Sequence, residues 1–229
     1  MKKIVGVLGS LTVDDENDKV IALYNNYNHA IIKNGGIPFV ITPYKNFDYW
    51  NTKISDMPIL TKEEENYYKN IVDMCDCLLI QGGYKWYNYY EFIIKYAMKK
   101  DIPILGICMG MQLLACIDNN SLDEKTLRLI DSKLEHKKKN IKYIHNVEIK
   151  NDTLLFSIIN KTTLDVNSNH RYEVIKTNDF IISAISQDGV IEAIENPNKR
   201  FVLGVQWHPE KMVDYDLSAN EIFKSFINN

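Results

Sequence analysis

Residues 102–118 join an apolar strand directly to an apolar helix through a single residue. Residues 102–107 have the pattern of a short buried strand, and residues 109–117 begin a helix with an apolar face. Cys108 falls on the turn between them, with Gly106 and Gly110 two residues away on either side. Glycines in these places let a chain turn sharply and keep a nucleophile exposed, as in a nucleophile elbow. The segment therefore predicts a sheet whose strands lead directly into helices.

The position of Cys108 permits two interpretations. The partial positive charge of a helix N-terminus favours a thiolate, which would make Cys108 a nucleophile. Alternatively, Cys108 is a small buried residue that fills a corner between strand and helix. The other cysteines, at positions 75, 77 and 116, match neither a disulfide framework nor the spacing of a zinc site. This usage favours a cytoplasmic protein.

The rest of the first half alternates between strand and helix patterns. Strands are expected at residues 4–8, 37–41 and 77–80, and helices at 18–33, from 61 onward and at 89–100. Such alternation predicts a parallel sheet covered on both faces. After about residue 125 short strands follow one another, at 143–150, 163–166, 180–186, 190–195 and 200–206, before a last helix at 218–229. The expected fold is a single α/β domain over residues 1–229, a three-layer sandwich with a mostly parallel central sheet and antiparallel strands in its C-terminal half.

Charge and hydropathy narrow the classes of partner. The chain of 229 residues has a net charge of −3, so no strong field favours nucleic acid or an anionic membrane. No apolar stretch approaches the length of about 18 residues that a membrane span requires. The basic run at residues 137–139 is interpreted as a solvated loop. Neither nucleic acid nor a membrane is expected as a partner.

A second motif follows the apolar strand at residues 201–205. It reads Gln206, Trp207, His208, Pro209 and Glu210. Binding and catalytic sites in open parallel sheets gather outside the carboxyl ends of the strands. Cys108, the His208 motif and the pair Gly82-Gly83 each follow a predicted strand, so we expect all three at one edge of the sheet.

Together these residues suit acyl transfer. Cys108 would attack a carbonyl, His208 would move the proton to the leaving amine, and Glu210 would orient the imidazole. The backbone N–H groups of Gly83 and Met109 would receive the oxyanion. Each feature alone also has a structural explanation: a strand cap, a surface acid or a turn. Their coincidence at one edge favours catalysis.

The sequence gives the remaining histidines no definite role. His145 and His170 could be either core residues or residues of a functional site. His29 and His136 are expected at the surface, without a function. No metal site is expected.

Residues 106–112 (Gly-Ile-Cys-Met-Gly-Met-Gln) together with residues 206–210 resemble the class I glutamine amidotransferase superfamily. Residues 166–170 and 188–195 are similar to the γ-glutamyl hydrolase branch, which includes γ-glutamyl-γ-aminobutyrate hydrolases. The resemblance extends over nearly the whole chain and implies a Cys108–His208–Glu210 triad with an oxyanion site at Gly83 and Met109. It also implies that the γ-glutamyl group is held by Gly82, Gln112, Ser168 and His170.

Three segments depart from the family pattern. Tyr84 and the residues up to Tyr87 replace a small or acidic residue followed by proline, and Met109 stands where arginine is common. Residues 117–121 replace a glycine-rich segment. Because these loops differ from the family pattern, the resemblance does not identify the particular substrate. Tyr84, Trp86 and Tyr87 form either an aromatic wall or a cover for the sheet edge.

The resemblance implies a hydrolase that cleaves the γ-glutamyl amide of a small molecule through a thioester on Cys108. Water is the final acceptor, and no cofactor is expected. A first alternative is a glutaminase subunit that supplies ammonia to a separate synthase partner. A second is an inactive binding or regulatory domain, which the intact triad disfavours. A homodimer is left open.

Overall fold

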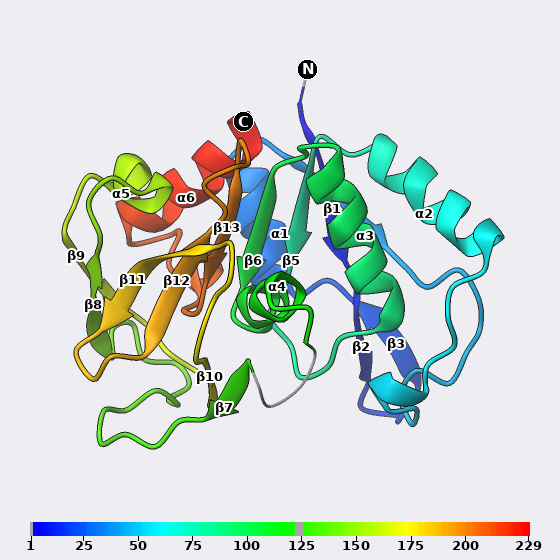
Figure 1. Ribbon diagram of the computed structural model, residues 1–229, viewed down its shortest axis with the longest axis horizontal. Helices are drawn as coiled ribbons and strands as arrows, with labels where there is room; N and C mark the ends of the chain where they lie inside the picture. Colours follow the sequence, from blue (N-terminus) through cyan, green and yellow to red (C-terminus); the bar gives the residue numbers. More distant parts are fainter. Residues whose placement is uncertain (1, 122–125) are drawn as a thin grey trace.

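A nine-stranded sheet runs through the computed structural model, which describes residues 2–121 and 126–229 (Figure 1). Its strands, in spatial order, are β4 (Ile37–Ile41), β1 (Ile4–Leu8), β5 (Cys77–Ile80), β6 (Ile104–Ile107), β13 (Val202–Val205), β12 (Ile191–Glu195), β11 (Ile181–Ser186), β8 (His145–Ile149) and β9 (Thr163–Val166). Neighbours from β4 to β13 pair in parallel, and those from β13 to β9 pair antiparallel. The predicted mixed sheet is confirmed.

Helices cover both faces of the sheet and complete the three layers. One hydrophobic core joins the sheet to α1 (Asn25–Lys33), α5 (Leu154–Ile159) and α6 (Leu217–Asn228). A second core joins it to α2 (Lys62–Asp73), α3 (Asn88–Lys99) and α4 (Met109–Asp118). In β5, Leu79 belongs to the first core while Leu78 and Ile80 belong to the second. This alternation follows from the two-residue period of a strand and explains why the parallel strands are apolar throughout.

Two small sheets and two short 3-10 helices complete the described structure. The sheets pair β2 (Ser10–Val13) with β3 (Lys19–Ala22), and β7 (Leu127–Leu129) with β10 (Tyr172–Val174). The 3-10 helices are η1 (Ile54–Asp56) and η2 (Pro209–Lys211). None of the described helices is both long and apolar enough to span a bilayer.

The helix predicted over residues 18–33 is wrong in its first part. Residues 19–22 form β3, and the helix begins only at Asn25. The Asp14 carboxylate accepts hydrogen bonds from the backbone N–H groups of Glu16 and Asp18, which closes a hairpin turn. The exposed and half-buried residues of β3 then alternate with period two. Local turn chemistry and strand pairing therefore override a helical spacing of apolar residues.

Short elements also escaped prediction. The one-and-a-half turns of α5 and the three-residue strands β7 and β10 are too short to show a period in the sequence. Residues 122–125 of the loop expected at 119–125 lie outside the described part of the chain.

Two glycines let β6 pass into α4 at close range. A methyl group on Gly110 would clash with the carbonyl oxygen of Ile80, and one on Gly106 would lie 2.8 Å from the carbonyl carbon of Gly110. Both contacts are with backbone, which cannot move aside as a side chain can. The glycines on either side of Cys108 therefore fix how closely α4 packs against the sheet.

Replacement of Gly110 by alanine is expected to destabilise the protein by roughly 1–3 kcal/mol, the usual cost of overpacking. Helix propensity alone predicts the opposite sign, a gain of about 0.5–1 kcal/mol. The free energy of unfolding in urea distinguishes the two. A Gly110→Ala variant as stable as the parent would contradict the close approach of α4 to β5.

Candidate active site

Cys108 occupies a strained turn at the end of β6. Its φ of +54° and ψ of −107° lie outside the regions that non-glycine residues normally adopt. Such a conformation costs about 1–3 kcal/mol and is typically found at functional sites. The backbone N–H of Cys108 donates to the carbonyl of Val205 at 2.8 Å, which continues the pairing of β6 with β13. The geometry is that of the predicted nucleophile elbow.

His208 and Glu210 follow the end of β13, the strand next to β6. Nδ1 of His208 lies 2.8 Å from Oε1 of Glu210, and both side chains are buried. Burial disfavours the imidazolium, but the charges of Glu210 and of the Cys108 sulfur outweigh this and raise the pKa of His208 to about 10. These two neighbours therefore favour the protonated form of His208.

Asn167 holds the backbone of His208. Its Nδ2 donates to the His208 carbonyl and its Oδ1 accepts from the His208 N–H, both at 2.8 Å. The sequence placed Asn167 within a family motif but gave it no role. An amide that satisfies both polar groups of one residue fixes that residue's position.

Tyr27 is a second residue that sequence reasoning missed. Its hydroxyl accepts a hydrogen bond of 2.8 Å from the N–H of Gly82. Burial, followed by the nearby charges of Glu210 and Cys108, raises the pKa of Tyr27 well above its usual value. Tyr27 therefore stays neutral beside the triad and closes one side of it.

The glycine pair after β5 lies against the triad. A methyl group on Gly82 would lie 2.8 Å from the Tyr27 hydroxyl, 3.2 Å from Cε1 of His208 and 3.3 Å from Cβ of Cys108. One on Gly83 would lie 3.3 Å from Sδ of Met109. Met109 is the first residue of α4, where backbone N–H groups have no acceptor within the helix. The side chain of Met109 thus lies beside Gly83, and the oxyanion site at the N–H groups of Gly83 and Met109 stays a prediction.

Two cavities border Cys108, His208 and Glu210. Cys108 opens into one of about 720 Å³, a volume that suits a small molecule. His208 and Glu210 line another of about 270 Å³. The larger cavity, which Cys108 lines, is the candidate substrate site.

The predicted substrate-binding residues occupy different places. Gln112 lines the larger cavity and donates from Nε2 to the carbonyl of Tyr172 and to Oε1 of Gln206, both at 3.1 Å. His170 also lines it. Ser168 lines the smaller cavity instead and donates to the carbonyl of His136 at 2.7 Å. The N–H of Gly82 is occupied by Tyr27, so Gly82 contributes space rather than a donor.

Of the aromatic residues after Gly83, two line the larger cavity and one is buried in the core. Tyr84, which is 93% exposed, and Trp86 line the larger cavity. Tyr87 is buried in the core beside α3. Between them, Nζ of Lys85 donates to the carbonyls of Thr52 and Trp50 at 2.6 and 3.2 Å and also to that of Tyr49, which anchors the loop.

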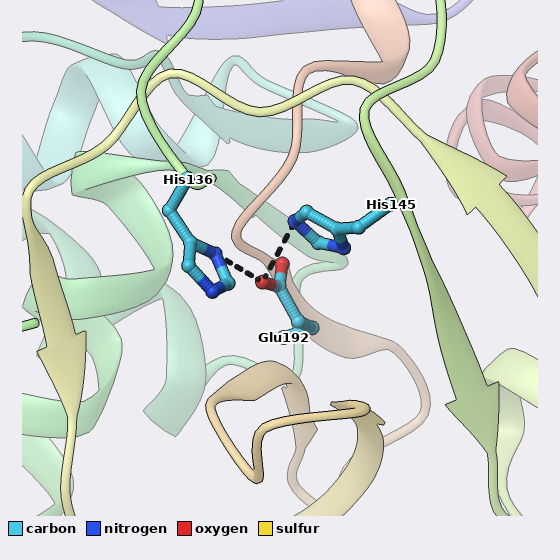
Figure 2. Close-up of side chains that lie close together, drawn as sticks. All are labelled: His136, His145 and Glu192. Carbon is cyan, nitrogen blue, oxygen red and sulfur yellow. Dashed lines mark ion pairs between the residues drawn. The ribbon is translucent and has the colours of Figure 1, made fainter. Parts of the chain in front are cut away.

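The expectation that His136 lies at the surface is wrong. Its side chain is 3% exposed and lies 2.9 Å from the Asp188 carboxylate. It also faces Glu192 and lies close to His145 (Figure 2). Its sequence neighbours Glu135 and Lys137 are exposed, so the local sequence resembles a surface loop. Partners distant in the sequence bury His136, and no local pattern shows them.

Comparison with known proteins identifies related chains. The family model of peptidase C26 matches residues 87–210. A glutamine amidotransferase-like protein of Rickettsia prowazekii is 32% identical, and the alignment covers 90% of this chain and 88% of that protein. A CTP synthase of Sulfolobus acidocaldarius is 31% identical over 59% of this chain, which matches only 30% of the synthase.

Among solved structures, the glutaminase domain of Trypanosoma brucei CTPS with bound acivicin superposes with a TM-score of 0.67. It is 18% identical, and the alignment covers 98% of this chain and 92% of that one, which supports the fold. The chain belongs to the peptidase C26 family, within the class I glutamine amidotransferase superfamily.

Proposed function

We propose that the protein hydrolyses the γ-glutamyl amide of a small molecule through a thioester on Cys108. The observation that carries the proposal is the placement of Cys108, held in a strained elbow at the wall of a 720 Å³ cavity beside the bonded pair His208–Glu210. Such a cysteine with a carboxylate-oriented histidine performs acyl transfer.

In the first half of the reaction the Cys108 sulfur, as thiolate, attacks the γ-carbonyl carbon, with the thiol proton on His208. The carbonyl oxygen becomes an oxyanion, which the N–H groups of Gly83 and Met109 stabilise. The C–N bond then breaks as His208 gives its proton to the leaving amine. The products of this half are the free amine and a γ-glutamyl thioester.

Water completes the cycle. His208 removes a proton from the water, whose oxygen attacks the thioester carbonyl. The C–S bond breaks and glutamate leaves, with Cys108 again a thiolate and His208 protonated. Glu210 stays negative throughout and stabilises the imidazolium through its 2.8 Å contact with Nδ1.

The lining of the larger cavity favours a substrate with more than one negative charge. Its rim includes three cationic side chains, those of Lys137, Lys139 and Arg171. The α-carboxylate of a γ-glutamyl group supplies one negative charge, and a leaving amine that bears a carboxylate would supply another. We therefore favour γ-glutamyl derivatives of amino acids, such as γ-glutamyl-γ-aminobutyrate, over glutamine itself.

The second candidate is a glutaminase that supplies ammonia to a synthase partner. The similarity to a CTP synthase favours it, since the chain matches only about a third of such a protein. The chemistry at Cys108 would be the same, with ammonia as the leaving group. A glutaminase of this kind should be nearly silent until its partner is added.

Cys108-dependent release of glutamate is the first expected result. The purified protein is offered glutamine, γ-glutamyl-γ-aminobutyrate, other γ-glutamyl amines and γ-glutamyl peptides. Cys108→Ala should abolish release while the fold is kept. Cys116→Ser is the matched control, a buried cysteine of the same helix that lines neither of the two cavities at the triad, and it should retain nearly full turnover.

The pattern of activity separates the candidates. Release from an anionic γ-glutamyl derivative supports the standalone hydrolase. Absence of glutamate release from every compound favours a partner-dependent glutaminase. Full activity of Cys108→Ala would contradict both.

Removal of the Glu210 charge should change the pH dependence of turnover. His208→Ala is expected to lose about 10²–10⁴-fold in kcat, the usual contribution of a general acid–base. Glu210→Gln should lose less, but because the negative charge holds up the pKa of His208, its neutral replacement lets His208 deprotonate at lower pH. The alkaline limb of the kcat/KM profile should therefore move to lower pH. An unshifted limb would show that Glu210 does not set the charge of His208.

Gly82→Ala should impair catalysis through crowding. Its new methyl group would meet Tyr27, His208 and Cys108 at once, and a displacement of about 1 Å at a reacting group can cost 10²-fold in rate. Gly83→Ala is the neighbouring comparison, since its methyl group would meet the flexible side chain of Met109 first. We expect a larger fall in kcat for Gly82→Ala, and a smaller one would contradict the packing described here.

A further inference from the structure

Four buried ionisable side chains meet away from the Cys108–His208–Glu210 triad. His136, His145 and His170 surround Glu192, and the four side chains are 3%, 1%, 2% and 0% exposed, in that order. Figure 2 shows three of them, His136, His145 and Glu192. They come from the loop before β8, the first residue of β8, the loop after β9, and β12. His170 also lines the substrate cavity, but the proposed bond-making and proton-transfer steps involve none of the four, so the cluster needs its own explanation.

One carboxylate oxygen is the centre of the cluster. Oε1 of Glu192 lies 3.3 Å from Nδ1 of His136, 3.5 Å from Nε2 of His145 and 3.6 Å from Nε2 of His170. Within the described residues, neither these three nitrogens nor the two Glu192 oxygens make a geometrically acceptable hydrogen bond. Buried polar atoms rarely remain in this state without a reason.

The opposite nitrogen of each ring has a partner that can only accept. Nε2 of His136 lies 2.9 Å from Oδ2 of Asp188. Nδ1 of His145 lies 3.3 Å from the carbonyl of Asn146, and Nδ1 of His170 lies 3.0 Å from that of Tyr172. Because carboxylates and carbonyls accept, these outer nitrogens donate, and a ring that carries only this one proton directs a lone pair inward at Glu192.

With these tautomers, the inner ring nitrogens and the Glu192 carboxylate are all hydrogen-bond acceptors that face one another. Three nitrogen lone pairs and a carboxylate repel one another in a buried place unless positive charge lies among them. A proton on one ring bridges a single nitrogen–oxygen contact and leaves the other two rings facing the carboxylate. A divalent cation can be bound by several of these atoms at once.

We propose that His136, His145 and Glu192 form a binding site for a divalent transition metal, with zinc as its reference ion and His170 as the fourth neighbour. The ligand atoms of the first three residues all lie within 4.8 Å of one another. Tetrahedral zinc with bonds of about 2.0–2.1 Å has ligand separations of roughly 3.4 Å. The distances from Oε1 of Glu192 to the three rings already match this value, and imidazole with carboxylate is a donor set that zinc accepts.

The surroundings of the cluster fit the same assignment. Metal-binding histidines usually donate their other N–H to a carboxylate or carbonyl, which fixes the ring. All three rings do so here, and the Asp188 carboxylate is itself held by the Ser186 hydroxyl at 2.5 Å. A surface cavity of about 340 Å³, lined by His136 and His170, offers a way in.

A metal in this place would have a structural role. It would fasten the loop that carries His136 to β12 in the central sheet. Lys137 follows His136 directly and lines the substrate cavity, so the fastening would also fix part of that wall. The sequence did not predict the site, because its ligands come from separate segments and show no ligand spacing.

The test uses untagged full-length protein in a Cys108→Ala background, so that the active-site thiol cannot bind the metal. Zinc is titrated calorimetrically, and metal content is measured after gel filtration. We expect one equivalent of zinc. His136→Ala and His145→Ala should abolish this binding, whereas His29→Ala, which alters an exposed histidine, should retain it.

A milder variant guards against loss of folding. Asp188→Asn removes only the charge behind His136 and should weaken zinc binding by about 10–100-fold. Cobalt(II) bound to the parent should give the visible absorption of a low-coordinate site, and circular dichroism checks that each variant folds. Failure of the parent to bind an equivalent of either metal would overturn the proposal. Equal binding by folded His136→Ala and His145→Ala would also overturn it, and the cluster would then be held by protons.

Discussion

The parallel pairing of β13 with β6 is the constraint on which the site depends. Cys108 and His208 stand 100 residues apart in the chain, yet Val205 pairs with Ile107 in adjacent strands. The Cys108 N–H bonds to the Val205 carbonyl, so the turn that leaves each strand begins at the same level of the sheet. A shift of the register by one residue would exchange the two faces of β13 and separate the thiol from the imidazole.

The pairing alone would leave His208 free to move, since it lies beyond the end of its strand. Asn167 removes that freedom by bonding both backbone polar groups of His208. Glu210 fixes the ring, and Gly82 leaves no spare room on the Cys108 side. Contacts from several elements therefore hold His208 in place beside the strained Cys108.

The sequence could predict the elements whose cause is local. The apolar runs of β1, β5 and β6 and the Thr61–Glu64 capping box of α2 are complete in short stretches of chain, and the structure confirms them. The sequence placed Cys108, His208 and Glu210 just after strands for the same reason, and the structure confirms that they follow β6 and β13, while their catalytic roles stay a prediction. The hairpin of β2 and β3 is also local, but the apolar residues of β3 have a helical spacing as well, so a helix was the wrong prediction there. The burial of His136 depends on Asp188 and Glu192, which no short stretch of sequence around it contains, so a surface histidine was the wrong prediction.

The Cys108–His208–Glu210 group and the buried histidine cluster share one feature but differ in what the histidine ring faces. In both, an outer contact fixes a histidine ring so that its other nitrogen faces inward. At His208 the outer contact is Glu210, and the inner neighbour is a thiol that can exchange a proton with the ring. At His136 the inner neighbour is the Glu192 carboxylate, which two further rings also face. The backbone joins the two places, because the N–H of Gln206 donates to the carbonyl of Glu192 between β13 and β12. A cation that fixed Glu192 would therefore hold the strand next to the one that carries His208, without touching the substrate.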